Sequence, residues 1–261
     1  MRARLVEPST DQILGYCEED PVERVFLEDV ARRGQGRFAA LERGDGTLAA
    51  LCHLGTNVVP SGAGSGAFAD LAVRASPRML IGEEAAVTEL WEAGRRRFER
   101  PREDRPGQPV YVSVTPPEPG SSGLREATLA DLDVLVPACA QAHFEEVGVD
   151  PLRRDAAGFR WRTRAQIEEG RSWLWLEDGV IRFKAEASAW TPAAVQLQQV
   201  WVDPAARRQG NAARALRDLI RLLLERVPAV CLFVRAENLP AIRLYEAVGM
   251  RRVLAYRSVL F

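Results

Sequence analysis

The pattern of apolar and polar positions predicts an alternation of strands and helices. In residues 195–202, apolar and largely β-branched side chains precede an Asp-Pro pair, which is typical of a strand that proline ends. In residues 212–227, apolar side chains recur every three or four positions, which indicates an amphipathic helix. Residues 230–234 are continuously apolar, as in a buried parallel strand. The chain is therefore expected to be an α/β protein with mixed sheets flanked by helices.

The same alternation extends over both ends of the chain, and hairpins are predicted about two Asp-Gly turns. A proline at position 137 is expected to interrupt one helix. The remaining expected elements are helices within 5–33, strands at 37–42 and 48–54, a helix at 68–73, a strand at 78–82, a helix at 83–98, a strand at 108–114, helices at 128–146 and 155–170, strands at 172–177 and 180–189, a helix after 238 and a strand at 251–261.

The clearest break in composition lies at residues 115–123, which hold three prolines and two glycines. Such a segment is typical of a linker that is stiff at first and then flexible. We therefore expect two domains, at residues 1–118 and 119–261.

A short polar segment joins the strand at 195–202 to the helix that follows it. Its residues run Arg207-Arg208-Gln209-Gly210-Asn211-Ala212. The start of a helix leaves several backbone N–H groups unpaired and carries about half a positive charge from the helix dipole. Gly210 lets the backbone approach a ligand closely, and the two arginines can pair with phosphates. The segment therefore predicts a phosphate site.

Two motifs resemble the core of the GNAT acetyltransferases. Arg207-x-x-Gly210-x-Ala212 is similar to the pyrophosphate loop of that family, and an Asn-x-x-Ala, Leu-Tyr-Glu and Gly-Met series follows about 30 residues later. The resemblance implies tandem GNAT-like domains with acetyl-CoA bound in the second, its pantetheine arm along the edge of the strand at 200–202. The implied coenzyme contacts are Val200, Trp201, Val202, Arg207, Arg208, Gln209, Gly210, Asn211, Ala212, Ala213, Asn238, Ala241, Leu244 and Tyr245.

The resemblance also implies a reaction, in which an amine attacks the thioester of acetyl-CoA directly. Tyr245 matches the family's general acid, which protonates the leaving thiolate, although it would also fit as a packing residue. Glutamines 196, 198 and 199 stand where many members carry a carboxylate base, so Glu186 on the neighbouring strand is the best available base. Alternatively, Glu186 is a structural partner of Lys184, and the protein is a non-catalytic acetyl-CoA sensor.

The sequence leaves four kinds of acceptor amine open: a protein lysine, a protein N-terminus, an antibiotic and a metabolite. In GNAT folds the first helices of the domain form one wall of the acceptor site. His143, Glu145 and Glu146 are therefore candidate acceptor contacts, with a solvated helix end as the alternative.

The first domain resembles a GNAT domain in its order of elements but lacks the phosphate loop. Its glycine-rich segment at 61–66 has neither a Gly-Lys-Ser ending nor a GxGxxG register, so a flexible turn is expected there. The domain is interpreted as a degenerate copy, as in a bacterial group whose N-terminal domain is poorly understood.

Composition narrows the choice of partners. The net charge of −1 offers no general attraction for nucleic acid or anionic membranes. Four scattered cysteines (Cys17, Cys52, Cys139 and Cys231) lie in apolar contexts, so we expect reduced core thiols and no metal site. Since the chain has neither a signal peptide nor an 18-residue apolar run, it is expected to be cytoplasmic.

Overall fold

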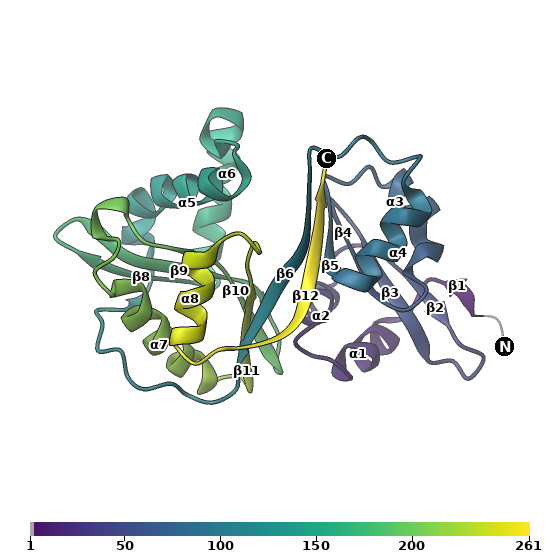
Figure 1. The fold of residues 1–261 in the computed structure, drawn as a ribbon, viewed down its shortest axis with the longest axis horizontal. Coiled ribbons are helices and arrows are strands. Elements are labelled where there is room, and N and C mark those ends of the chain that lie inside the picture. The colour runs from purple at the N-terminus through teal and green to yellow at the C-terminus, as the bar shows by residue number, and fades with distance from the viewer. Residues whose placement is uncertain (1–2) are drawn as a thin grey trace.

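The strands of the computed structural model, which describes residues 3–261, form one continuous twelve-stranded sheet (Figure 1). Their order across the sheet is β1-β2-β3-β4-β5-β12-β6-β11-β10-β9-β8-β7. The strands are β1 (Arg4–Val6), β2 (Phe38–Glu42), β3 (Leu48–Leu54), β4 (Asn57–Gly62), β5 (Met79–Glu83), β6 (Glu103–Ser113), β7 (Arg125–Glu126), β8 (Ser172–Glu177), β9 (Val180–Trp190), β10 (Ala194–Trp201), β11 (Ala229–Phe233) and β12 (Arg251–Leu260).

One order of elements occurs twice along the chain. In each copy a short strand and two helices precede three strands, and a helix–strand–helix–strand series follows. This repetition fits the expected pair of GNAT-like copies. The helices are α1 (Thr10–Glu18), α2 (Val25–Arg32), α3 (Ala69–Arg74) and α4 (Glu84–Gly94) in the first copy, and α5 (Leu132–Val147), α6 (Pro151–Glu168), α7 (Asn211–Leu224) and α8 (Leu239–Ala247) in the second.

The two copies exchange their last strands. β12, the last strand of the second copy, lies between β5 and β6 and is antiparallel to both. β6, the last strand of the first copy, lies between β12 and β11. Figure 1 shows these two long strands side by side at the centre of the molecule. The division expected at residue 118 therefore cuts the chain in its linker but does not divide the sheet.

A helix of the first copy also covers the sheet of the second. Val25 on α2 is fully buried in a cluster with Ala189 of β9 and Cys231 of β11. Two ion pairs join the same region: Arg171 Nη2 lies 2.8 Å from Asp29 Oδ1, and Arg33 Nη2 lies 2.6 Å from Glu169 Oε2. All four cysteines are free and buried, as expected of core thiols.

The linker is fixed to α7, which corrects the expectation of flexibility. Asp218 accepts hydrogen bonds from the backbone N–H groups of Gly120 and Ser122, at 2.7 and 2.8 Å. Arg221 donates to the carbonyl of Pro117 at 2.7 Å. A Cβ on Gly120 would lie 1.8 Å from the carbonyl oxygen of Arg214, so only glycine fits there.

Some local expectations were wrong. α5 continues through Pro137, and the irregular backbone lies instead at Asp155 in α6. The glycine-rich segment at 61–66 is not a loose turn, because Ser61 and Ser65 are fully buried. Ser61 also bonds to Tyr16 at 3.1 Å. The short strand β1 was not predicted, because three residues carry no readable period.

The exchanged strand should stabilise the copy that it enters. Val259 of β12 is fully buried in the core of the first copy, among residues such as Leu80 and Phe68. Val259→Ala is expected to lower the free energy of unfolding by about 2 kcal/mol, because it leaves a cavity in that core. Val253→Ala is the matched control, since Val253 lies on the same strand and is half exposed. Equal midpoints for the two variants in urea unfolding would contradict this role.

Candidate active site

β10 and β11 separate after a short parallel pairing. They are paired only from Ala194–Gln196 to Ala229–Cys231. Beyond that point β10 remains paired with β9, and β11 with β6. The register of β10 shifts between Gln198 and Trp201, and Gln199 there has a left-handed φ of +49°. One edge of β10 is therefore open towards β11 near residues 198–201, as the family resemblance implies for the pantetheine arm.

The N-terminus of α7 presents a run of free backbone N–H groups. Gly210 precedes the helix with a φ of +78° and supplies no side-chain cap. Nothing in residues 3–261 accepts a hydrogen bond from the N–H groups of Arg208 to Ala213. A Cβ on Gly210 would meet no atom within 4 Å, so this backbone faces open space. Together with the helix dipole, these groups suit the oxygens of a pyrophosphate.

Two side chains of this loop hold the loop itself. Asn211 donates to the carbonyl of Ala206 at 3.1 Å and is buried. Arg207 donates to both carboxylate oxygens of Glu145 on α5, at 2.9 and 3.0 Å, and to the carbonyl of Val202. The phosphate contact predicted for Arg207 therefore requires this ion pair to rearrange.

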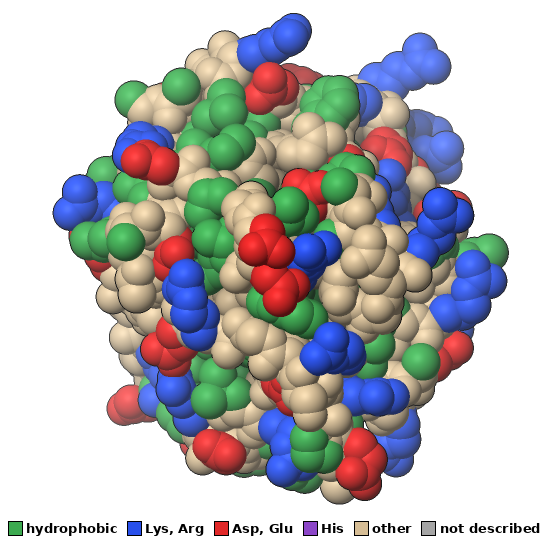
Figure 2. Space-filling view, turned by 90° about the vertical axis from the view of Figure 1, so that its left-hand side faces the viewer, with side chains coloured by type: hydrophobic (Ala, Val, Ile, Leu, Met, Phe, Trp, Pro, Cys, Tyr) green, Lys and Arg blue, Asp and Glu red, His purple; other side chains and the backbone are tan. Residues whose placement is uncertain are grey.

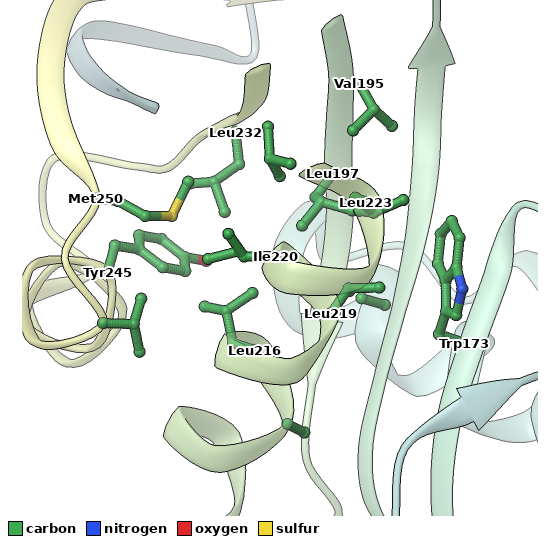
Figure 3. Packing of buried hydrophobic residues seen from close by; sticks show 14 of the residues in the cluster. Trp173, Val195, Leu197, Leu216, Leu219, Ile220, Leu223, Leu232, Tyr245 and Met250 are labelled. Carbon is green, nitrogen blue, oxygen red and sulfur yellow. The ribbon is translucent and has the colours of Figure 1, made fainter. Parts of the chain in front are cut away.

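Tyr245 and Asn238 lie together at the other side of the gap. Asn238 caps α8 by accepting a hydrogen bond from the N–H of Ala241 at 3.2 Å. Figure 3 shows the ring of Tyr245 extending from α8 towards Leu216 and Ile220 of α7. Burial raises the pKa of the Tyr245 hydroxyl above its usual value. The hydroxyl therefore keeps its proton at neutral pH.

Two hollows lie beside the gap and meet at Asn57 and Gln199. We call the larger the central hollow; it has a volume of ≈ 860 Å³. It is lined at the gap by Val200, Trp201, Arg235, Asn238 and Tyr245, and by Arg105 and Gln108 of β6. The second, the side hollow, has a volume of ≈ 740 Å³. Its lining includes His53 and Asp29 from the first copy, and Cys139, Glu186, Gln198 and Arg171 from the second.

Glu186 lies in the side hollow and is held by three donors. Lys184 Nζ is 3.1 Å from Glu186 Oε1, Cys139 donates its thiol proton at 3.0 Å, and Gln198 donates its amide at 3.4 Å. Lys184 is fully buried and also donates to Gln199 at 3.0 Å. Burial raises the pKa of the Cys139 thiol to about 12, so it stays protonated. The two residues predicted to be catalytic, Glu186 and Tyr245, thus line different hollows.

The end of α5 forms a wall of the central hollow, where an acceptor contact was predicted. His143, Glu145 and Glu146 all line it. His143 is half-buried, and burial lowers the pKa of its imidazole below the usual value of 6.5. The imidazole is therefore largely uncharged at neutral pH.

Sequence reasoning missed three residues of the central hollow. Arg105 and Gln108 lie on β6, and only the strand exchange brings this strand of the first copy to the site. Arg235 directly follows the strand at 230–234, so its place at the gap was a readable signal.

The first copy has no equivalent loop for a phosphate. The carboxylate of Glu89 already accepts the N–H of Gly64 at 2.7 Å. The helix that follows, α3, has only 6 residues. A Cβ on Gly82 of β5 would lie 2.9 Å from the carbonyl oxygen of Pro60 on β4, so these two strands stay close together.

Charge is mixed on the surface of the second copy. Figure 2 shows acidic and basic side chains interspersed over that end of the molecule. Among residues 3–261, no helix is both long and apolar enough to cross a bilayer, and no group of His, Cys, Asp and Glu side chains is arranged to hold a metal ion.

Several solved structures share this fold. A GNAT-family acetyltransferase described as putative, from Novosphingobium aromaticivorans, is 17% identical, with a TM-score of 0.56 over 92% of this chain and 97% of its own. A GCN5-related N-acetyltransferase from Sphaerobacter thermophilus is 17% identical, with a TM-score of 0.58 over 99% and 95%. A tandem GNAT protein from the clavulanic acid biosynthesis pathway is 11% identical, with a TM-score of 0.56 over 98% of both chains. These likenesses show the shared fold.

Family models divide the chain in two. Residues 36–135 match a domain of unknown function, DUF4081, and residues 138–250 match the acetyltransferase (GNAT) family. No curated protein matches the chain. The chain therefore carries a GNAT acetyltransferase domain at residues 138–250 behind a DUF4081 domain, and this domain marks the protein as an acyltransferase.

Proposed function

We propose that the protein transfers the acetyl group of acetyl-CoA to an amine bound in the central hollow. The observation that carries this proposal is the run of free N–H groups from Arg208 to Ala213, beside the open edge of β10. The first feature suits the pyrophosphate of the coenzyme, and the second suits its peptide-like pantetheine arm. An N–H of the open edge, at Val200 or Val202, would then polarise the thioester carbonyl.

The reaction forms a C–N bond and breaks the C–S bond of the thioester. An alkyl amine with a pKa of about 10.4 is almost fully charged at pH 7, so its nitrogen must lose one proton before attack and a second afterwards. The thiolate takes up one proton, and the other passes to water. The site must therefore supply an acid near the sulfur and a base near the amine.

Tyr245 suits the role of the acid. It lines the central hollow beside the gap, and burial raises its pKa, so the hydroxyl keeps a proton that it can donate to the thiolate.

His143 suits the role of the base better than Glu186. Its imidazole lines the same hollow as Tyr245, and burial keeps it uncharged at neutral pH, so that it can accept a proton. The carboxylate of Glu186 is already ion-paired with Lys184 and accepts hydrogen bonds from Cys139 and Gln198. We infer that Glu186 positions the bulge of β10 at Gln198 and Gln199.

A carboxylate at the start of α7 should prevent coenzyme binding. Gly210→Asp is expected to weaken acetyl-CoA binding at least tenfold, because the new charge would face the pyrophosphate at close range. Gly210→Asn is the matched control: asparagine adopts the same left-handed backbone and has a similar shape without the charge. Calorimetric titration of acetyl-CoA measures both. Equal affinity of the aspartate and asparagine variants would place the pyrophosphate elsewhere.

Removal of the Tyr245 hydroxyl should slow the reaction without affecting coenzyme binding. For Tyr245→Phe we expect kcat to fall by about 10²-fold or more, as for loss of a general acid, while the dissociation constant of acetyl-CoA stays within about threefold. Release of thiol in the presence of amines reports kcat. Unchanged turnover would leave Tyr245 as a packing residue. Tight acetyl-CoA binding with no turnover of any amine by the wild type would instead support a sensor.

The choice of base can be tested by comparing two isosteric changes. We expect His143→Gln to lower kcat by about 10²-fold at pH 7 with little effect on stability. Glu186→Gln should keep kcat within about threefold but lower the free energy of unfolding by about 3 kcal/mol, because it leaves the Lys184 ammonium buried without a counter-charge. Adding Lys184→Met should recover much of that loss. The reverse ranking of kcat would return the role of base to Glu186.

A further inference from the structure

Unpaired polar atoms gather around the central hollow. Six buried side-chain nitrogen or oxygen atoms in residues 3–261 have no hydrogen-bond partner, and four of them belong to residues that line this hollow. They are Arg105 Nε, Gln108 Oε1, Trp201 Nε1 and Arg235 Nε. Buried polar groups are rarely left unpaired in folded proteins. Their concentration here indicates a place shaped for a polar ligand.

Of the two arginines in this group, Arg235 has the positive charge that is less well neutralised by carboxylates. Its guanidinium makes no hydrogen bond to any described residue, and its nearest carboxylate oxygen is Glu103 Oε1 at 3.9 Å from Nη1. Glu103 is already paired with Arg105, whose Nη2 lies 2.5 Å from Oε2. Two arginines therefore share one carboxylate at this wall. Gln108, which is 2% exposed and lies on the same strand as Arg105, adds an unused acceptor.

The other charged groups that line the hollow do not neutralise the charge of Arg235. Asp104 is paired with Arg257 at 2.7 Å, and Glu145 is paired with Arg207. Within residues 3–261, Glu146 and Glu237 form no ion pair, and three further arginines also line the hollow. Those arginines are Arg78, Arg102 and Arg154. The hollow thus combines spare arginine donors with a smaller number of free carboxylates, so its lining attracts an anion overall.

We infer that the amine acceptor carries a carboxylate, which Arg235 binds with the help of Arg105. The flat fork of an arginine matches the two oxygens of a carboxylate. Gln108 Oε1 would accept an N–H of the same molecule. The acceptor class is then an amino acid, or a short peptide with a free carboxylate. This inference rests on the proposed amine transfer and adds the group by which the amine is chosen.

The test compares amines that differ only in the carboxylate. The probes are glycine, β-alanine, 4-aminobutyrate and 6-aminohexanoate, each beside its carboxamide, with 2-aminoethyl phosphate as a separate anion. For the chain length that fits best, we expect kcat/KM to be at least tenfold higher for the acid than for the amide. Equal values for acid and amide at every length, or a preference for the phosphate, would overturn the inference.

Variants locate the preference on Arg235. Arg235→Met should lower kcat/KM for the best acid at least tenfold and leave its amide unchanged. Arg243→Met is the control, because Arg243 is an exposed arginine of the neighbouring helix, outside the hollow. Acetyl-CoA affinity is measured for both variants. An equal loss of acetyl-CoA affinity in Arg235→Met would make Arg235 a coenzyme contact and overturn the inference.

A binding measurement separates this inference from the proposed reaction. The N-acetyl forms of the same four acids and amides are titrated calorimetrically into protein saturated with CoA. If no probe is acetylated but the N-acetyl acids bind, and Arg235→Met abolishes that binding, the carboxylate site stands while amine transfer fails. If amines are acetylated without regard to the carboxylate, the reaction stands and the site fails. If no acid is acetylated and no N-acetyl acid binds, the carboxylate site is overturned.

Discussion

The antiparallel pairing of β6 with β12 is the contact on which the rest of the molecule depends. Each strand ends its own copy of the repeat and enters the sheet of the other copy. The pairing runs from Arg251 opposite Val112 to Leu260 opposite Glu103. Without it, the first copy would lose the neighbour of β5, and the second would lose the neighbour of β11. The candidate site is therefore a property of the whole chain, since β6 carries Arg105 and Gln108 into the central hollow.

A second, local constraint opens the sheet where chemistry is needed. β10 stays paired with β9 through a bulge, while β11 stays paired with β6. The two parallel strands β10 and β11 therefore separate after three paired residues. Lys184 and Glu186 of β9 hold Gln199 and Gln198 at the bulge. A buried ion pair of this kind contributes little net stability, and here it contacts the strand at the point where β10 leaves β11. The unpaired backbone edge at the gap follows from that geometry.

The sequence predicts the second copy well, because local signals coincide with the fold there. The helical period of residues 212–227 and the glycine at position 210 give α7 and its N-terminus. Pairing between strands that are far apart along the chain leaves no such signal in the sequence. Nothing in residues 103–113 indicates that they lie between β11 and β12. For the same reason Arg105 and Gln108 were missed, and the sequence does not show that Glu186 and Tyr245 line different hollows.

The place of β12 also has a consequence for synthesis on the ribosome. β5 and β6 emerge early, yet the strand that joins them is made only after the whole second copy. Until then both edges of β6 lack their partners, and Tyr111 of this strand lacks the residues of the second copy against which it packs. Nascent chains usually fold domain by domain from the N-terminus. Here β6 cannot complete its pairing until the second copy has been made, so its two edges stay open for most of translation.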